Sequence, residues 1–119
     1  MKSGYRAIAL VDDDEDTVNL FSYFLGENGY DVIGFTNPLL LLDYVNHHDN
    51  QLRLVLIDYK MPQITGCELA NKIAEINPGI EMVLITAIND IINNKLNLEL
   101  IHKPIRMHQL LHIVGKYMN

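Results

Sequence analysis

Leu54-Val-Leu-Ile-Asp58-Tyr-Lys-Met-Pro62 is the stretch of this chain with the strongest structural signal. A short apolar run, rich in branched side chains, ends in one aspartate and is followed by a proline turn. Such a run without polar alternation is typical of a parallel strand that is buried on both faces. Because the crevices of open α/β sheets lie at the carboxyl ends of their strands, Asp58 is predicted to lie in a functional site.

A second apolar run also ends in acids. Residues 7–11 read Ala-Ile-Ala-Leu-Val and lead directly into Asp12, Asp13 and Asp14. If both runs are parallel strands, these acids and Asp58 share one edge of the sheet. Carboxylates that lie close together raise one another's pKa unless a cation neutralises them. Oxygen ligands without nearby sulfur or imidazole favour a hard cation, so the pattern predicts a Mg²⁺ site.

Strand and helix patterns alternate along the whole chain. Apolar runs predict the strands, and apolar residues spaced three and four apart predict the helices between them. Two helix starts carry capping signals: Asn37-Pro38 supplies an N-cap with a first-turn proline, and Thr65 with Glu68 matches a capping box. The predicted strands cover residues 5–11, 31–35, 54–58, 80–85 and 98–101, and the predicted helices begin near residues 17, 38, 66 and 107.

The segment from residue 88 to residue 97 has the weakest pattern. Its four asparagines disfavour a helix, although Ile91, Ile92 and Leu96 suit one short helical turn or two. We therefore predict a shortened fourth helix. Alternating strands and helices imply a parallel sheet with helices on both faces and right-handed crossovers. The predicted fold is accordingly a three-layer α/β domain with five parallel strands.

Length and composition narrow the functional classes. The 119 residues suit one domain, 1–119, and the 49% of hydrophobic residues are enough for a single core. A net charge of −6 without a basic cluster argues against direct nucleic-acid binding. The single cysteine, Cys67, excludes an internal disulfide and suits a reducing compartment. Without a leader pattern or a membrane-spanning apolar stretch, we expect a cytoplasmic domain that does not bind membranes.

Two more strand ends carry chemically useful side chains. Thr86 follows the predicted fourth strand and Lys103 follows the fifth, so both should reach the edge where the acids lie. If Mg²⁺ offsets the charge of a phosphoryl group, the Asp58 carboxylate can attack it and form an aspartyl phosphate. Lys103 would then supply a positive charge, and Thr86 a hydrogen bond, to the phosphoryl oxygens. Taken singly, this threonine and this lysine would be read as a helix cap and a surface cation.

Four motifs resemble, in order, those of the receiver domains of two-component response regulators. The resemblance extends over essentially the whole chain and implies a flavodoxin-like (βα)5 fold with strand order 2-1-3-4-5. It also implies a switch domain that becomes phosphorylated rather than a turnover enzyme. The matching residues are Val11-Asp12-Asp13-Asp14, Leu56-Ile57-Asp58 with Met61-Pro62 and Gly66, Leu84-Ile85-Thr86-Ala87, and His102-Lys103-Pro104.

The resemblance also implies a set of Mg²⁺ ligands and a phosphodonor. By that likeness Asp58 accepts the phosphoryl group from a sensor histidine kinase or a phosphotransfer protein and contributes to the metal site. Asp13 and the carbonyl oxygen of Lys60 would bind Mg²⁺ directly, and Asp12 largely through water.

For the phosphoryl group itself, the resemblance implies two further contacts. Thr86 would be the switch hydroxyl, and Lys103 would be the cation that binds the phosphoryl oxygens. The peptide bond between Lys103 and Pro104 is expected to be cis, as is usual in this family.

The interval between Thr86 and Lys103 departs from the family pattern. It is shorter by about one helical turn. We also expect Ile101 to stand in place of an aromatic residue that follows the threonine during the switch. These departures predict intact phosphorylation chemistry with an altered signalling surface. They also leave an alternative function open, a pseudo-receiver that binds proteins without phosphorylation.

Lys60 bears on two further questions of mechanism. A phosphatase of the haloacid-dehalogenase type also uses an aspartate nucleophile and Mg²⁺, but it needs an acid two residues after the nucleophile, where this chain has Lys60. In the receiver family the side chain at this position points toward the mouth of the site. Here the long Lys60 side chain, together with Ile88, would obstruct the water that hydrolyses an aspartyl phosphate. We therefore predict a long-lived phosphorylated state.

Overall fold

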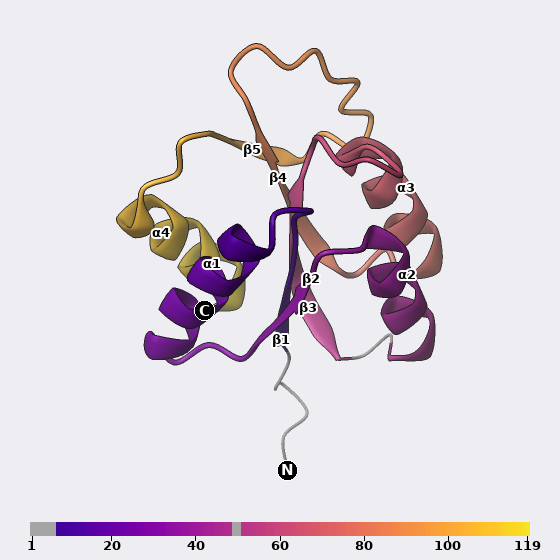
Figure 1. Ribbon diagram of the computed structural model, residues 1–119. Coiled ribbons are helices and arrows are strands. Elements are labelled where there is room, and N and C mark those ends of the chain that lie inside the picture. Colours follow the sequence, from indigo (N-terminus) through magenta and orange to yellow (C-terminus); the bar gives the residue numbers. More distant parts are fainter. Residues whose placement is uncertain (1–6, 49–50) are drawn as a thin grey trace.

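Five parallel strands form the central layer of the computed structural model, which describes residues 7–48 and 51–119 (Figure 1). The strand order is β2-β1-β3-β4-β5, which confirms the flavodoxin-like prediction. The first predicted strand began at residue 5, and residues 5 and 6 lie outside the described ranges. The strands are β1 Ala7–Val11, β2 Val32–Phe35, β3 Leu52–Asp58, β4 Glu81–Thr86 and β5 Glu99–His102.

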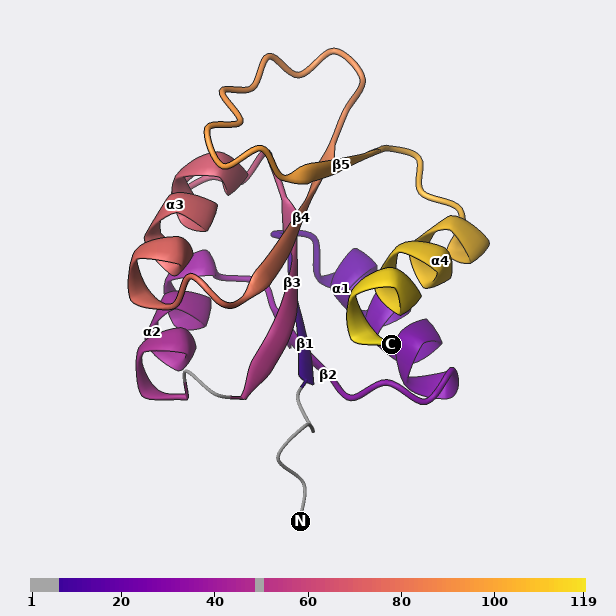
Figure 2. The same cartoon turned by 180° about the vertical axis from the view of Figure 1, so that it is seen from behind.

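Helices cover both faces of this sheet. Helices α1 and α4 lie on one face and α2 and α3 on the other (Figures 1 and 2). Both predicted caps are present: the Asn37 side chain accepts a hydrogen bond from the Leu39 amide at 2.9 Å, and Thr65 with Glu68 forms a reciprocal capping box. None of the helices in the described ranges is long and apolar enough to cross a membrane. The helices are α1 Glu15–Glu27, α2 Pro38–His47, α3 Gly66–Ile76 and α4 Met107–Met118.

The apolar core is divided by the sheet into two clusters. Along β3, Leu54 and Leu56 pack beneath α1 and α4, whereas Val55 and Ile57 pack beneath α2 and α3. All four side chains are fully buried, which explains why this strand reads as an unbroken apolar run. Burying each such side chain contributes about 1.5–3 kcal/mol to stability. The end of β3, where Asp58 lies, is therefore held by a strand that is buried on both faces.

The chain between β4 and β5 differs from the prediction. Residues 87–98 contain turns but no helix, so the predicted short helix is absent from this part of the described chain. Side chains bond the backbone instead: the Asp90 carboxylate accepts from the Ala87 amide at 2.7 Å, and Asn94 both accepts from and donates to the backbone of Leu98. Asn97 has a φ of 55°, in the left-handed region that asparagine tolerates. Asparagine and aspartate thus provide the local bonds that compete with a helix.

Strand β5 is an edge strand, and it is anchored by α4 rather than by a preceding helix. The Glu99 carboxylate, at the start of β5, accepts hydrogen bonds from the Tyr117 hydroxyl at 2.7 Å and the Lys116 amine at 2.9 Å. On the apolar side, Ile101 packs in the cluster beneath α1 and α4. These contacts hold the strand that leads into Lys103.

Candidate functional site

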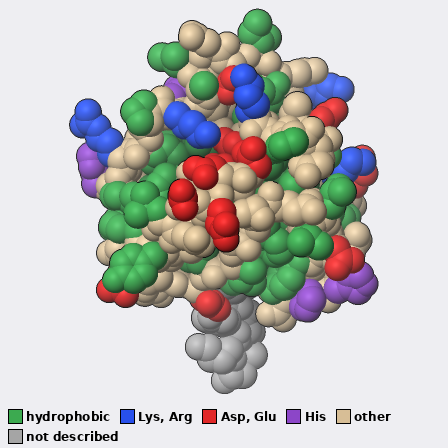
Figure 3. Space-filling model, viewed as in Figure 1, with side chains coloured by type: hydrophobic (Ala, Val, Ile, Leu, Met, Phe, Trp, Pro, Cys, Tyr) green, Lys and Arg blue, Asp and Glu red, His purple; other side chains and the backbone are tan. Residues whose placement is uncertain are grey.

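Three carboxylates meet where β1 and β3 end. The two strands are neighbours in parallel register, with Val11 beside Ile57, so the residues that follow these partners emerge side by side. Asp12, Asp13 and Asp58 each offer an oxygen atom within 4.8 Å of the others, as a metal site requires. Within the described ranges this is the only group of three or more acidic, histidine or cysteine side chains so placed. Figure 3 shows acidic side chains gathered near the centre of this face, with basic side chains beside them.

The donor set fits a hard divalent cation. Asp12 and Asp58 are only 4% and 3% exposed, whereas Asp13 is open to solvent. Burial raises the pKa of Asp12, and it raises the pKa of Asp58 to about 6, with the neighbouring carboxylates adding to the effect. Two buried carboxylates that lie this close, Asp12 and Asp58, destabilise the folded protein when both are ionised and no cation neutralises them. Lys60 lies two residues beyond Asp58 with an exposed side chain, and its carbonyl oxygen remains a predicted ligand.

Lys103 follows β5 and reaches Asp58 from the side of β3 that faces away from β1, the strand that leads into Asp12 and Asp13. Its amine lies 2.8 Å from a carboxylate oxygen of Asp58, and its side chain is 45% exposed. Burial lowers the pKa of Lys103, but the bonded Asp58 and the charges of Asp12 and Asp13 raise it more, so the pKa lies above its usual range. The peptide bond between Lys103 and Pro104 is cis, as predicted. The amine is therefore a permanent cation at physiological pH, placed against the carboxylate expected to be phosphorylated.

Thr86 is the last residue of β4 and is almost completely buried, with 2% of its surface exposed. Its carbonyl accepts a hydrogen bond from the Lys103 amide at 2.7 Å, which ties the ends of β4 and β5 together. Its hydroxyl lies 3.1 Å from Nδ1 of His102. No contact of His102 was predicted from the sequence. The register of β4 and β5, which pairs Thr86 with His102, is set by packing across the sheet, so no local signal in the sequence marks this contact.

A glycine allows the chain after β3 to fold back against Asp58. A Cβ atom built on Gly66 would lie 2.8 Å from the Asp58 carbonyl oxygen and 2.8 Å from the Cα of Tyr59. The Gly66 amide donates a hydrogen bond of 2.7 Å to the Tyr59 carbonyl. A larger residue would displace the backbone that carries the site, which gives a physical reason for glycine here.

Ile101 and Thr86 lie on opposite faces of the sheet. Side chains alternate along a strand, so Thr86 shares a face of the sheet with Leu84, whereas Ile101 lies on the other face beneath α1 and α4. Ile101 is 2% exposed and packed in that core. The residues of β5 that share a face with Thr86 are Leu100 and His102. Ile101 is therefore not on the face of the sheet where it could follow Thr86, and its standing in place of the family's aromatic residue stays a prediction.

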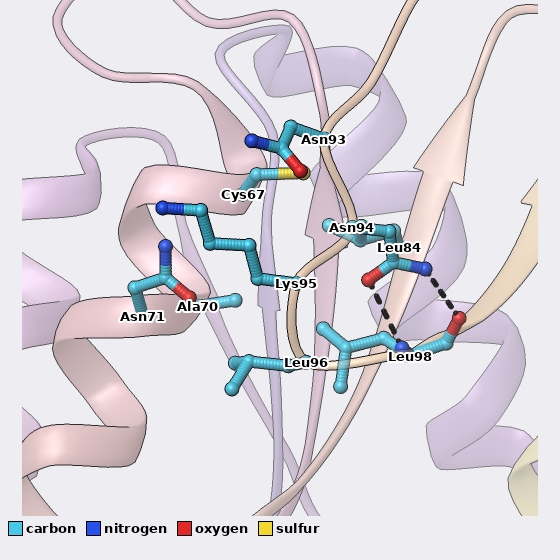
Figure 4. A pocket seen from close by; sticks show the side chains of 9 residues that line it. All are labelled: Cys67, Ala70, Asn71, Leu84, Asn93, Asn94, Lys95, Leu96 and Leu98. Atoms are coloured by element: carbon cyan, nitrogen blue, oxygen red, sulfur yellow. Dashed lines mark hydrogen bonds between the residues drawn. The ribbon is translucent and has the colours of Figure 1, made fainter.

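A narrow second pocket lies between α3 and the turns of residues 87–98, away from the acids. Figure 4 shows Cys67 of α3 beside Asn93, and the paired hydrogen bonds of Asn94 to the Leu98 backbone. Burial raises the pKa of the Cys67 thiol, so it is not an activated thiolate. The pocket floor includes Leu84 of the buried strand β4. This hollow is a packing feature of the helix-free connection.

Comparison with known proteins identifies relatives over most of the chain. A model of the response regulator receiver domain matches residues 8–115. The chain is 28% identical over 116 residues to the response regulator receiver protein CpdR of Brucella abortus, covering 93% of this chain and 95% of that protein. It is 33% identical over 93 residues to the CpxR homolog of Haemophilus influenzae, a transcriptional regulatory protein, covering 78% of this chain but only 39% of that protein.

Solved structures have the same fold. A receiver domain protein from Clostridium thermocellum superposes with a TM-score of 0.87 at 22% identity, covering 96% of this chain and 94% of that one. A CheY-like receiver domain protein from Methanospirillum hungatei superposes with a TM-score of 0.84 at 24% identity, with the same coverage of 96% and 94%. At these identities the likeness supports the fold.

Proposed function

Since this chain belongs to the receiver domains of two-component response regulators, we propose that it is a phosphoacceptor switch whose modified residue is Asp58. One observation carries the proposal: a buried carboxylate at a strand end lies 2.8 Å from a lysine amine and beside two further carboxylates. A lysine paired with a lone acid would form an ordinary ion pair. The two extra acids provide for a divalent cation as well, and a cation with a lysine suits an incoming phosphoryl group.

The proposed reaction is transfer of a phosphoryl group from a phosphohistidine to Asp58. A carboxylate oxygen of Asp58 attacks the phosphorus, the bond between phosphorus and the donor nitrogen breaks, and that bond's electrons leave with the imidazole. With a pKa of about 6, Asp58 is ionised at pH 7 and above and can act as the nucleophile. Mg²⁺ bound by Asp12, Asp13 and Asp58, with the Lys60 carbonyl, would supply positive charge against the phosphoryl oxygens.

Two further side chains act on the transferred group. The Lys103 amine, now paired with Asp58, would turn to a phosphoryl oxygen and keep an ion pair in the product. The Thr86 hydroxyl would donate a hydrogen bond to another oxygen. The product is a mixed anhydride that persists until water attacks it, so the domain acts as a switch and not as a turnover enzyme. The phosphodonor would be a sensor histidine kinase or a phosphotransfer protein. The reaction would take place in the cytoplasm, a reducing compartment in which a protein with a single cysteine needs no disulfide.

The pseudo-receiver alternative draws its support from the missing helix between β4 and β5. That change lies on the connection and leaves the acids and Lys103 in place. A module that had lost phosphorylation would have no need to keep two buried carboxylates beside a third acid, which costs stability. We therefore favour the phosphoacceptor function.

Intact mass spectrometry tests the proposal. The parent protein and an Asp58→Asn variant are incubated with Mg²⁺ and acetyl phosphate, with and without a chelator. We expect one added phosphoryl group on the parent alone, lost when the chelator is present. An Asp16→Asn variant, which changes an exposed acid in the first turn of α1, should be modified like the parent. Equal modification of the Asp58→Asn variant would overturn the assignment of this residue.

A further inference from the structure

The hydrogen bond between Thr86 and His102 joins a predicted site residue to one with no assigned role. The two residues are register partners on the neighbouring strands β4 and β5, and Thr86 Oγ1 lies 3.1 Å from His102 Nδ1. Thr86 is buried, whereas His102 is exposed. Within residues 7–48 and 51–119, the Thr86 hydroxyl is hydrogen-bonded to this imidazole. A buried switch hydroxyl is thus bonded to a side chain that solvent and other molecules can reach.

The strand order gives this bond a direction. Strand β4 lies between β3, which carries Asp58, and β5, which carries His102. Neighbouring strands are about 4.8 Å apart. A hydroxyl bonded to the side chain of its β5 partner is therefore turned away from the strand that carries Asp58. To reach a phosphoryl group on Asp58, Thr86 has to leave His102, which a change of its χ1 rotamer would achieve.

With His102 Nδ1 as the acceptor of the 3.1 Å bond, the two bonds of the Thr86 hydroxyl are mutually exclusive. A threonine hydroxyl has one proton to donate, and phosphoryl oxygens on an aspartyl phosphate only accept. We propose that His102 is a positioning residue: in the unphosphorylated protein its Nδ1 accepts a hydrogen bond from the Thr86 hydroxyl, and this bond breaks when Thr86 turns to the phosphoryl group. The exposed imidazole thereby reports the state of the buried site at the surface beside residues 87–98. This inference rests on the proposed function.

Binding of beryllofluoride, an unreactive phosphoryl mimic, measures the competition. In the presence of Mg²⁺ we expect a His102→Ala variant to bind it about two- to ten-fold more tightly than the parent, since one net hydrogen bond no longer has to break. A His108→Ala variant is the matched control, because His108 is also exposed but lies in the first turn of α4. Its affinity should equal that of the parent. Weaker or unchanged binding by a folded His102→Ala protein would overturn the inference.

A double-mutant cycle separates this route from a general loosening of the sheet edge. In a Thr86→Ala background there is no hydroxyl for His102 to hold, so adding His102→Ala should leave beryllofluoride affinity unchanged. If His102→Ala strengthens binding equally in both backgrounds, the effect does not pass through Thr86 and the inference fails.

Imidazole ¹⁵N spectra of the unsubstituted protein test the same bond without a variant. We expect Nδ1 of His102 to show an acceptor's chemical shift before beryllofluoride is added and to move when it binds with Mg²⁺, while the His108 signals stay in place. A His102 that donates through Nδ1, or whose signals do not move on saturation, would contradict the proposal. Failure of the parent to bind beryllofluoride at all, or equal binding by Asp58→Asn, would instead refute the proposed phosphoacceptor function.

Discussion

The ends of β1 and β3 and the connection from β4 to β5 lie at the same edge of the sheet, but different interactions hold them. Asp58 follows a strand whose side chains are buried on both faces, and it is 3% exposed. The connection is held by local bonds from Asp90 and Asn94, and two of its isoleucines, Ile88 and Ile91, are 77% and 92% exposed. Packing of the core thus positions Asp58, whereas local hydrogen bonds shape much of the connection.

This contrast explains how a receiver domain can lack a helix between β4 and β5 and still bring the three acids and Lys103 together. Lys103 is held in place by β5, which pairs with β4 and is anchored to α4 through Glu99. None of these contacts involves residues 87–98. Where the fourth helix was predicted, residues 87–98 form turns, with His102 next to them at the strand end.

The largest expected difference between the two regions is in the free energy of unfolding. Leu84 of β4 and Leu96 of the connection line the same pocket, but Leu84 is fully buried and Leu96 is 40% exposed. Leu84→Ala should cost about 2–5 kcal/mol through lost burial and the cavity left behind. Leu96→Ala should cost less than about 1 kcal/mol. Urea unfolding followed by circular dichroism measures both, and equal losses would show that the connection is part of the core.

The charge buried at the site predicts an unusual dependence of stability on pH. The pKa of Asp58 is raised from its usual value near 3.8 to about 6, so the folded protein binds this proton more tightly than the unfolded chain does. In the metal-free protein, this contribution to stability is fully present below pH 4 and is lost as the pH rises through 6. Two pKa units correspond to roughly 3 kcal/mol.

Unfolding experiments with a chelator at pH 4.5 and pH 7.5 would measure this effect. The Asp58→Asn variant should lose less stability than the parent between these pH values, because it has no carboxyl group to ionise. The control Asp16→Asn should behave like the parent. Adding Mg²⁺ should stabilise the parent at pH 7.5 and much less at pH 4.5, where Asp58 is protonated. A parent whose metal-free stability rises over this range would refute the assigned direction.

A smaller and local effect is expected in the connection. Asn94→Ala removes two hydrogen bonds to the Leu98 backbone, of 3.0 and 2.8 Å, and should cost about 1–2 kcal/mol. Amide hydrogen exchange should speed up in residues 93–98 and remain slow in β3. The control is Asn89→Ala, since Asn89 is exposed in the same segment. Loss of acetyl phosphate reactivity in Asn94→Ala would show that the connection supports the site after all.

The smallest effect concerns the lifetime of the phosphorylated state. Lys60 is exposed two residues after Asp58, and Ile88 is exposed two residues after Thr86, so both can obstruct the hydrolytic water. Lys60→Asn should shorten the lifetime of the aspartyl phosphate a few-fold, which corresponds to roughly 1 kcal/mol. Intact mass measured over time gives the rate. Lys72→Asn changes an exposed lysine of α3 and should leave the lifetime as it is.

The features predicted correctly from the sequence are those with strong local signals. The apolar run before Asp58 marks a buried strand, and Thr65 with Glu68 marks a helix start, because each depends on neighbours in the chain. Converging acids were also predictable, since parallel strands end at one edge. The connection was harder: isoleucines and a leucine suggested a helical turn, but asparagine bonds to the backbone prevailed, a competition that composition alone does not resolve.

Outside residues 87–98, the sequence by itself determined the order of strands and helices, the caps, and which side chains stand at strand ends, because these follow from periodicity and from short-range bonding. Only the tertiary structure decided which strand ends touch. In the folded chain the Ile101 side chain points into the core, and Thr86 is hydrogen-bonded to His102, 16 residues away in the sequence. Register between strands and the face on which a side chain lies depend on packing across the whole sheet, and no local stretch of sequence contains that information.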